Sequence, residues 1–204
     1  MLYFGNQNNC SDWSGMRDLV YYVAVSMDGF IADDAGGVSA FPQAPETVAA
    51  LFERYPETCP APLRESLGVT ATPRRFDTVV MGRRTFEPAL AAGWCDGAYT
   101  HLRQVVVTHD DLPECSGLTV LTGDIASQVE TMKRETGKDI WLCGGGTLAA
   151  QLVEVIDEIQ IKVNPVMLGS GTPLLPAPGG PKACRLVAVE ALPSGVVLLT
   201  YRCR

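Results

Sequence analysis

Residues 82–85, GRRT, place a glycine, two arginines and a threonine where the predicted backbone changes from strand to helix. The preceding residues TVVM suit a buried strand, and the next apolar residues recur at the i,i+4 spacing of a helix. The first turn of a helix has unpaired N–H groups and partial positive charge, so it favours an anion. Arginine can add two parallel hydrogen bonds to a phosphate. The segment predicts a phosphate site; the alternative is a turn with two solvated arginines.

Two further segments of this kind lie at predicted strand ends. Residues 144–148, GGGTL, follow the apolar run 140–143, and His109 follows the β-rich run 103–108. Ligands of α/β sheets bind at the carboxyl ends of strands, so three such segments would suit a dinucleotide. The glycine run is not GxGxxG and has no acidic residue about twenty positions later, which argues against a Rossmann site.

The overall charge excludes some classes of function. The 204 residues carry a formal net charge of −7, which argues against general nucleic-acid binding. A phosphorylated ligand must therefore be held by local positive charge. The apolar share of 47% suits a globular protein, and no apolar run reaches the roughly 18 residues that would predict a membrane span.

The seven cysteines and two histidines predict neither a disulfide framework nor a metal site. The cysteines are scattered and never spaced CxxC. We therefore expect no metal and a reducing, cytoplasmic location. Residues 1–17 form a polar leader that lacks the features of a signal peptide and need not be ordered, and residues 18–204 form one domain.

Strand and helix patterns alternate along the chain. Strands are predicted at 19–25, 30–32, 78–81, 103–108, 118–122 and 140–143, and a half-exposed strand at 156–163. Helices are predicted to begin at Pro45, Thr85 and Asp124 and near Leu148. Thr85 as the N-cap would place Pro88 in the first turn, where proline is tolerated. The proline-rich residues 56–75 form an irregular excursion that could be a lid or an interface.

The last two predicted strands, 185–191 and 196–202, are joined by a hairpin signal at Pro193-Ser194-Gly195. Strand–helix alternation followed by a hairpin predicts the α/β class. We expect a mostly parallel sheet, covered by helices on both faces, with antiparallel C-terminal strands.

The motifs VAVSMDGFIA, FDTVVMGRRTFE, VVVT, WLCGGGTLAAQL and DEIQIKVNPVMLGSGTPLLP occur in this order from about residue 18 to residue 201. In this respect the chain resembles the dihydrofolate reductase-like reductases, and most closely the RibD C-terminal domain, the reductase domain of bacterial riboflavin biosynthesis proteins. The resemblance implies the dihydrofolate reductase-like three-layer α/β/α fold, with NADPH lying across the strand ends.

The resemblance also implies which residues bind the cofactor. The residues that would hold the 2′-phosphate and pyrophosphate are Gly82, Arg83, Arg84 and Thr85, and those that would flank the adenosine 2′-phosphate are Thr108 and His109. The residues that would cradle the pyrophosphate and approach the nicotinamide are Gly144, Gly145, Gly146, Thr147 and Leu148. Ala24 would contact the nicotinamide carboxamide through its backbone. The arginines favour NADPH over NADH, because a 2′-phosphate suits a guanidinium.

The resemblance is weaker on the substrate side. Val48 stands where dihydrofolate reductases carry the acid that binds the pterin, so folate reduction is not expected unless Glu46 reaches inward. Asp28 is the substrate-side candidate, with a simple turn role as the alternative. Basic residues that could hold a substrate phosphate are Arg64, Arg74, Arg75 and Lys162.

The sequence therefore predicts an NADPH-dependent reductase of a small, pyrimidine- or pterin-like heterocycle. A missing catalytic base does not contradict this, because the cofactor supplies the chemistry. The alternative is an NADP-binding module of the same fold that reduces nothing. The C-terminal hairpin would suit a homodimer.

Overall fold

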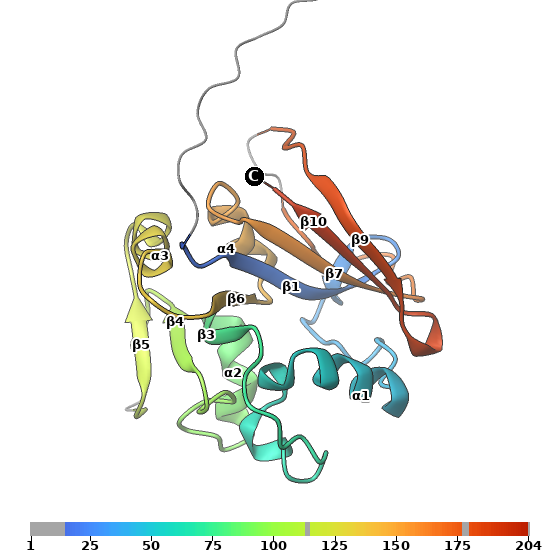
Figure 1. Ribbon diagram of the computed structural model, residues 1–204, viewed down its shortest axis with the longest axis horizontal. Helices are drawn as coiled ribbons and strands as arrows, with labels where there is room; N and C mark the ends of the chain where they lie inside the picture. Colours follow the sequence, from blue (N-terminus) through green and yellow to red (C-terminus); the bar gives the residue numbers. More distant parts are fainter. Residues whose placement is uncertain (1–14, 113–114, 177–179, 204) are drawn as a thin grey trace, which may run out of the picture.

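The computed structural model describes residues 15–112, 115–176 and 180–203. Its main sheet has eight strands in the order β5-β4-β3-β6-β1-β7-β10-β9 (Figure 1). Their bounds are β1 Leu19–Ser26, β3 Phe76–Gly82, β4 Arg103–Val107, β5 Leu118–Leu121, β6 Asp139–Cys143, β7 Glu158–Asn164, β9 Arg185–Ala191 and β10 Val197–Arg202. A separate two-stranded ribbon pairs β2 (Phe30–Ala32) with β8 (Thr172–Pro173).

The strands from β5 to β7 in this order are parallel, whereas β10 and β9 are antiparallel. Parallel neighbours need a crossover connection, which the intervening helices and loops supply, but an antiparallel pair can be joined by a short turn. That turn is the 3₁₀ segment Pro193–Gly195 between β9 and β10. The predicted α/β class, with antiparallel C-terminal strands, is confirmed.

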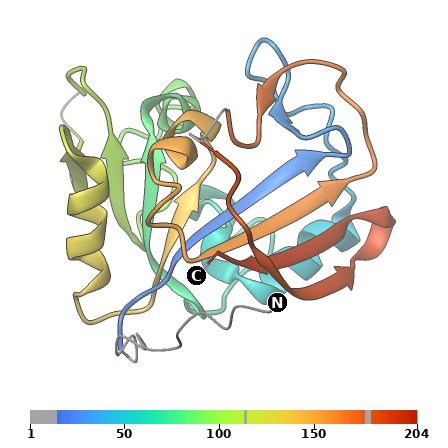
Figure 2. The ribbon, with the colours of Figure 1, turned by 90° about the horizontal axis from the view of Figure 1, so that it is seen from above.

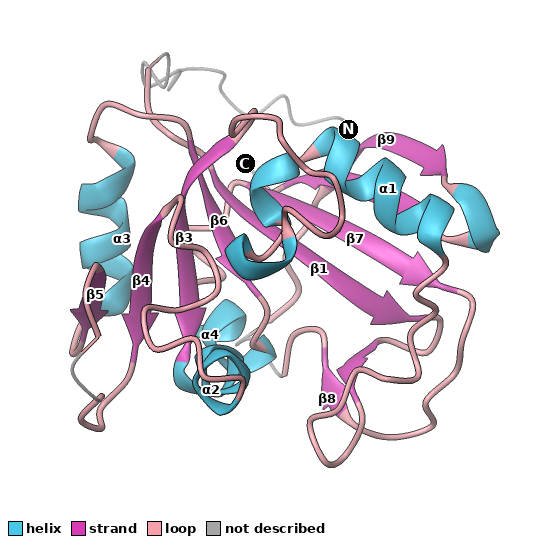
Figure 3. Cartoon of the chain, turned by 90° about the horizontal axis from the view of Figure 1, so that it is seen from below, coloured by secondary structure: helices cyan, strands magenta, loops and turns pink. Residues whose placement is uncertain are grey.

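Helices cover both faces of the sheet. In Figure 1, α1 (Pro45–Arg54) and α2 (Arg83–Ala91) lie on one face, and α3 (Ile125–Lys133) and α4 (Gly146–Gln151) lie on the other. Figure 2 looks onto the side with α3 and α4, and Figure 3 onto the side with α1 and α2. Side chains of β1 alternate between the two hydrophobic cores, Tyr21 packing on the α3–α4 side and Tyr22 on the α1–α2 side.

The start of α2 differs from the prediction. Gly82 is the N-cap, with extended backbone and no side-chain cap, and the helix begins at Arg83 rather than after Thr85. Pro88 therefore lies inside the helix, where it cannot donate an N–H to the carbonyl of Arg84. The prediction of Thr85 as N-cap was wrong. It rested on keeping Pro88 in the first turn of the helix and gave too little weight to Gly82, where the strand ends. Thr85 is instead a residue of the first turn.

The prediction of a half-exposed strand near residue 160 was also wrong. β7 lies between β1 and β10 and not at an edge of the sheet. Glu158 and Gln160 are buried, and Lys162 is half-buried. The polar half of the alternating pattern therefore faces the α1–α2 side of the protein and not open solvent.

The irregular excursion at 56–75 is confirmed and is tied to the sheet by one side chain. The segment contains two 3₁₀ turns, Pro56–Thr58 and Ala61–Leu63. The fully buried Glu57 carboxylate accepts the backbone N–H groups of Arg74, Arg75 and Phe76, at 3.0, 2.7 and 2.7 Å. Because Phe76 begins β3, the excursion is anchored at the amino end of the sheet, which does not support a lid over the strand carboxyl ends.

Residues 1–14 of the predicted leader lie outside the described residues. Arg17, which the prediction also assigned to the leader, is buried. Its side chain pairs with Asp77 and donates to Thr78 Oγ1 at 2.6 Å, and its backbone N–H donates to the carbonyl of Lys133 at 2.9 Å. Arg17 is therefore part of the folded domain.

Candidate functional site

Two helix starts meet at the carboxyl end of the sheet. α2 begins directly after β3, and α4 begins three residues after β6 ends. Because β3 and β6 are hydrogen-bonded parallel neighbours, both starts lie at the same edge of the sheet. The unpaired N–H groups of the first turn of α2 and of the glycine turn at 144–146 therefore face one region. The six-residue α4 adds little dipole of its own.

The glycine turn fits closely against its surroundings. A Cβ on Gly144 would lie 3.2 Å from Thr85 Oγ1, and one on Gly146 would lie only 2.3 Å from the carbonyl oxygen of Pro173. Gly144 and Gly145 have φ of +61° and +68°, a conformation that favours glycine. Without side chains there, the backbone beside Thr85 stays accessible, as a cradle for a pyrophosphate requires.

The two arginines have different surroundings. Arg83 is half-buried, with its Nε 3.1 Å from Glu87 Oε1 and its Nη1 donating to the carbonyl of Asp111 at 3.0 Å. Arg84 is exposed and makes no hydrogen bond or ion pair with any described residue. Arg83 thus fastens the loop after β4, whereas Arg84 is available to a ligand.

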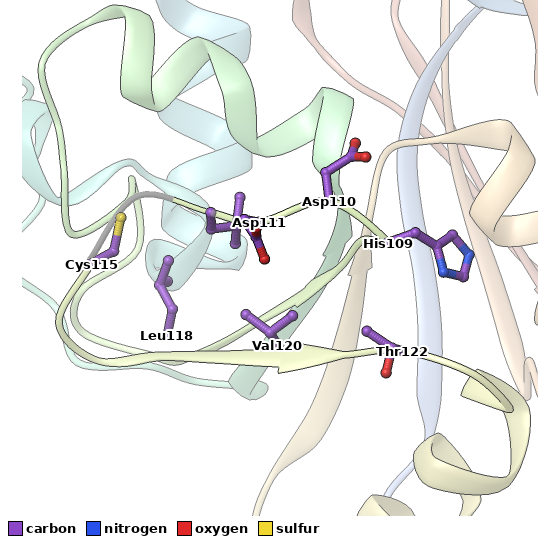
Figure 4. Close-up of a pocket in the computed structure, with 8 residues that line it drawn as sticks. His109, Asp110, Asp111, Cys115, Leu118, Val120 and Thr122 are labelled. Carbon is purple, nitrogen blue, oxygen red and sulfur yellow. The ribbon is translucent and has the colours of Figure 1, made fainter.

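Thr108 and His109 begin that loop. Thr108 is buried, and its Oγ1 accepts the N–H of Asp110 at 3.0 Å and donates to the carbonyl of the same residue at 3.3 Å. His109 is exposed at the rim of a shallow cavity of about 350 Å³ between the loop and β5 (Figure 4). Asp110 and Asp111 also line this cavity, so its charge suits an adenosine better than a phosphate.

Ala24 and Asp28 lie on the other side of the glycine turn. Ala24 is half-buried in β1 and is aligned with Lys162 of β7. Asp28 accepts hydrogen bonds from Ser26 Oγ at 2.6 Å and from the N–H groups of Leu168 and Gly169 at 3.1 and 2.7 Å. These bonds lower the pKa of Asp28 from 3.8 to about 2, so it is ionised at neutral pH and cannot serve as a proton donor.

The remaining predicted acids and bases are occupied away from this region. Glu46 is exposed and accepts Ser194 Oγ at 2.7 Å, so it does not reach inward. Arg64 donates to the carbonyls of Pro56 and Ala71, and Arg75 pairs with Asp139 at 3.0 Å and Glu158 at 2.8 Å. These arginines hold the fold together and form no basic cluster for a substrate phosphate.

Two residues that sequence reasoning did not select, Tyr22 and Cys143, lie close to Lys162. Its Nζ lies 3.7 Å from the centroid of the Tyr22 ring, and Cys143 at the end of β6 is also in its vicinity. The sequence signal that could have pointed to this group of residues was the alternation of polar and apolar residues at 158–163. A strand in the middle of a parallel sheet is usually apolar on both faces, so polar residues there are unusual.

Within the described ranges, no cluster of three or more His, Cys, Asp or Glu side chains could bind a metal. None of the helices in the same ranges is long and apolar enough to cross a membrane.

The strand order and the helices on both faces of the sheet form an α/β fold of the dihydrofolate reductase-like type. The sequence pattern of the RibD C-terminal domain matches residues 17–198, so the chain belongs to the RibD C-terminal domain family. Among curated relatives, it is 25% identical to the uncharacterized protein YyaP of Bacillus subtilis (strain 168) over 204 residues, which covers 91% of this chain and 94% of that protein.

Many solved structures share the fold, among them the following three. A provisionally named riboflavin biosynthesis protein from Shewanella sp. PV-4 is 21% identical, with a TM-score of 0.64 over 92% of this chain and 99% of that one. Dihydrofolate reductase from Enterococcus faecalis, complexed with NADP(H) and RAB-propyl, is 14% identical, with a TM-score of 0.62 over 91% and 95%. A Thermotoga maritima diaminohydroxyphosphoribosylaminopyrimidine deaminase/5-amino-6-(5-phosphoribosylamino)uracil reductase is 14% identical, with a TM-score of 0.60 over 94% and 58%.

Proposed function

We propose that the protein is an NADPH-dependent reductase that transfers a hydride to a small, pyrimidine- or pterin-like heterocycle. The observation that carries this proposal is the contact between Thr85 in the first turn of α2 and the glycine turn after β6, with the unpaired Arg84 beside them. Family membership supports it, as does the fold shared with a dihydrofolate reductase complexed with NADP(H).

The residues present fit such a cofactor. Arg84 and the N–H groups at the start of α2 would bind phosphate oxygens, with the guanidinium selecting the 2′-phosphate of NADPH. Gly144 and Gly145 would let the pyrophosphate approach the backbone, and Thr147 is exposed at the start of α4. The loop carrying His109, fastened by Arg83, would border the adenosine. When bound, the cofactor supplies the hydride, and the protein aligns it with the acceptor carbon.

Asp28 would have a positioning role. Its carboxylate joins the turn after β1 to residues 168–169, and Leu174 N–H donates to the carbonyl of the neighbouring Gly29 at 2.9 Å. Since Pro173 also contacts Gly146, this turn and the glycine turn are linked through β8. Asp28 would therefore fix the substrate side of the site relative to the cofactor side, and the proton would come from water.

The direct test of the reductase proposal is turnover. Purified protein and NADPH would be mixed with flavin precursors, pterins and quinones, and the loss of reduced nicotinamide would be recorded. We expect at least one substrate to be reduced at a rate proportional to protein concentration, and more slowly with NADH. If NADPH binds but none of these compounds is reduced, the reductase assignment is contradicted for these substrate classes.

The second candidate function is an NADP-binding module without reductase activity. It is favoured by the substrate side, where the polar candidates Glu46 and Asp28 are engaged with other parts of the protein and Val48 replaces the acid of folate enzymes. Stoichiometric NADPH binding without oxidation would support this module. Protein-dependent turnover of any substrate would exclude it.

We further propose that the protein works in a reducing cytoplasm. All six cysteines within the described residues are free thiols. Intracellular redox systems keep such thiols reduced.

A further inference from the structure

Lys162 is half-buried, and it differs from the buried Lys133 and Arg17 and from the half-buried Arg75 because it has no carboxylate partner among the described residues. Lys133 Nζ lies 2.6 Å from Asp157, Arg17 pairs with Asp77, and Arg75 pairs with Glu158. Among the described residues, none places a carboxylate within ion-pair distance of Lys162. An ammonium withdrawn from water without an anion is costly and therefore unusual in a folded protein.

The surroundings of Lys162 place its charge beside the expected position of the reacting groups. It lies in the second half of β7, aligned with Ala24 on one side and Leu198 on the other. Its Nζ is 3.7 Å from the centroid of the Tyr22 ring, a cation–π contact. Figure 3 shows the carboxyl ends of β1 and β7 between α1 and the β2–β8 ribbon in that view.

The Tyr22 hydroxyl is a second polar group without a hydrogen-bond partner among the described residues. Tyr22 is only 2% exposed. Buried hydroxyls without a hydrogen-bond partner are uncommon in folded proteins. Both groups lie on the α1–α2 side of neighbouring strands, and a ligand with an acceptor oxygen could satisfy both.

The electrostatic environment fits a site that binds an anion. Burial lowers the pKa of Lys162 to about 8, because no carboxylate stabilises its charge. The nearby titratable groups are Tyr22, the Cys143 thiol with its hydrogen-bonded partner Tyr99, and Arg54 across the Tyr22–Tyr55 ring pair. Burial raises the pKa of the Cys143 thiol to about 12, so that thiol stays neutral.

We propose that Lys162 and Tyr22 form the substrate anchor, and that the substrate carries a carboxylate or an ionisable ring oxygen conjugated to the bond that is reduced. This inference rests on the proposed reductase function. When bound, the cofactor would supply a hydride to the substrate carbon, and the electron pair of the reduced bond would move to the conjugated oxygen. The Lys162 ammonium would stabilise that negative charge until a proton arrives from water.

The test compares benzoate with benzamide, two flat rings of similar shape that differ in charge. Binding to the NADP⁺-saturated protein would be followed by tryptophan fluorescence, since Trp141 lies 6.5 Å from Tyr22 between ring centroids. We expect benzoate to bind at least about tenfold more tightly than benzamide, and Lys162→Gln to abolish this preference. Tyr22→Phe should weaken both probes, and Lys182→Gln, at a surface lysine paired with Glu154, should change nothing.

A second measurement follows the Lys162 ammonium directly. Reductive ¹³C-methylation would label the four lysines, and the signal lost in Lys162→Gln identifies Lys162. We expect this signal to titrate near pH 8 and its pKa to rise when benzoate is added. A signal that titrates at the ordinary lysine value, or equal binding of both probes to the unmodified sequence, would overturn the anchor.

The two proposals can fail separately. If NADPH does not bind but benzoate does so through Lys162, the reductase function is wrong and the anion site stands. If NADPH binds and benzoate shows no dependence on Lys162, the anchor is wrong and the reductase function stands.

Discussion

At the scale of single residues, the described structure contains two kinds of charged side chain. Some form hydrogen bonds or ion pairs that hold the fold together, and others form neither. Arg83, Asp28 and Glu57 each bind specific backbone groups or partner side chains. The side chains of Arg84 and Lys162 make no hydrogen bond or ion pair with the described residues, although Lys162 lies over the Tyr22 ring. This contrast identifies the residues that a ligand would use, and it separates the effects expected from their replacement.

Lys162→Met should make the ligand-free protein more stable. The folded protein binds this proton less readily than the unfolded chain, because burial lowers the pKa of Lys162 from 10.5 to about 8. The resulting destabilisation grows as the pH falls from 10.5 and is complete below about pH 8. We expect urea unfolding at pH 7 to show a gain on the order of 1–3 kcal/mol, which shrinks toward pH 10. A loss of stability at pH 7 would contradict the buried, unpaired charge.

Asp28→Asn should have the opposite dependence on pH. The carboxylate is stabilised by three hydrogen bonds that lower its pKa to about 2, so its contribution is complete above about pH 4 and disappears as the pH falls toward 2. The variant should melt at a lower temperature than the unmodified sequence at pH 7, and the two melting temperatures should converge near pH 2. A difference in melting temperature that does not change with pH would show that the carboxylate charge is unimportant.

Glu57→Gln should destabilise the protein by about 1–3 kcal/mol, because an amide nitrogen would face the N–H of Arg74 that Glu57 Oε2 now accepts at 3.0 Å. Urea unfolding measures the change. Glu65→Gln, at an exposed residue of the same excursion, serves as the control and should be neutral. Equal effects of the two substitutions would mean that Glu57 does not anchor the excursion.

At the scale of elements, local sequence patterns predicted most strands and helices. The β-branched runs became β1, β3, β4, β5 and β6, Pro45 begins α1, and Asp124 caps α3 by accepting the N–H of Ser127 at 3.1 Å. The errors arose where tertiary contacts override local signals. α2 starts at Arg83 because β3 ends at Gly82, despite Pro88. β7 buries polar side chains because Gln160 and Glu158 contact Tyr55 and Arg75 on the α1–α2 side.

The site was predictable to a similar extent. The GRRT and GGGTL segments could be placed at strand ends from sequence, because each follows an apolar run. The difference between Arg83 and Arg84 could not be predicted, because it depends on Asp111, far along the chain. Lys162 and Tyr22 are 140 residues apart in the sequence and meet only because their strands are neighbours in the sheet. No local sequence pattern encodes that strand pairing.

A pair of thiols flanks the β9–β10 hairpin, and an oxidant should join them. Cys184 Sγ and Cys203 Sγ are 3.1 Å apart, and Cys184 is exposed. With oxidised glutathione, the two thiols would give up two electrons and two protons and form a disulfide, while glutathione is reduced. We expect peptide mass mapping to find this crosslink, and Cys184→Ser to abolish it. Full alkylation of both cysteines after oxidation would contradict their proximity.

At the scale of the whole molecule, β9 is an edge strand with exposed apolar side chains. Leu186, Val187 and Val189 are 49%, 49% and 61% exposed. Exposed apolar edges tend to pair with another chain. We propose that two copies associate through this edge and form a homodimer.

Val189→Lys should convert that dimer into a monomer without unfolding it, because a charge on an exposed edge disfavours strand pairing. Light scattering coupled to size-exclusion chromatography measures the mass, and circular dichroism checks the fold. Val120→Lys on the opposite edge strand, 47% exposed, is the matched control and should remain dimeric. A dimer that persists in Val189→Lys would place the interface elsewhere.

Because the net charge is −7, a phosphorylated cofactor would have to be held by local positive charge, which Arg84 supplies in our proposal. The most direct measurement is therefore the titration of the protein, Arg84→Gln and Arg83→Gln with NADPH and NADH, followed by tryptophan fluorescence. We expect NADPH to bind on the order of micromolar and NADH more weakly. Arg84→Gln should lose about tenfold or more for NADPH alone, whereas Arg83→Gln should weaken both cofactors. Equal binding of the two cofactors to the unmodified sequence, or no binding of either, would contradict an NADPH-dependent reductase.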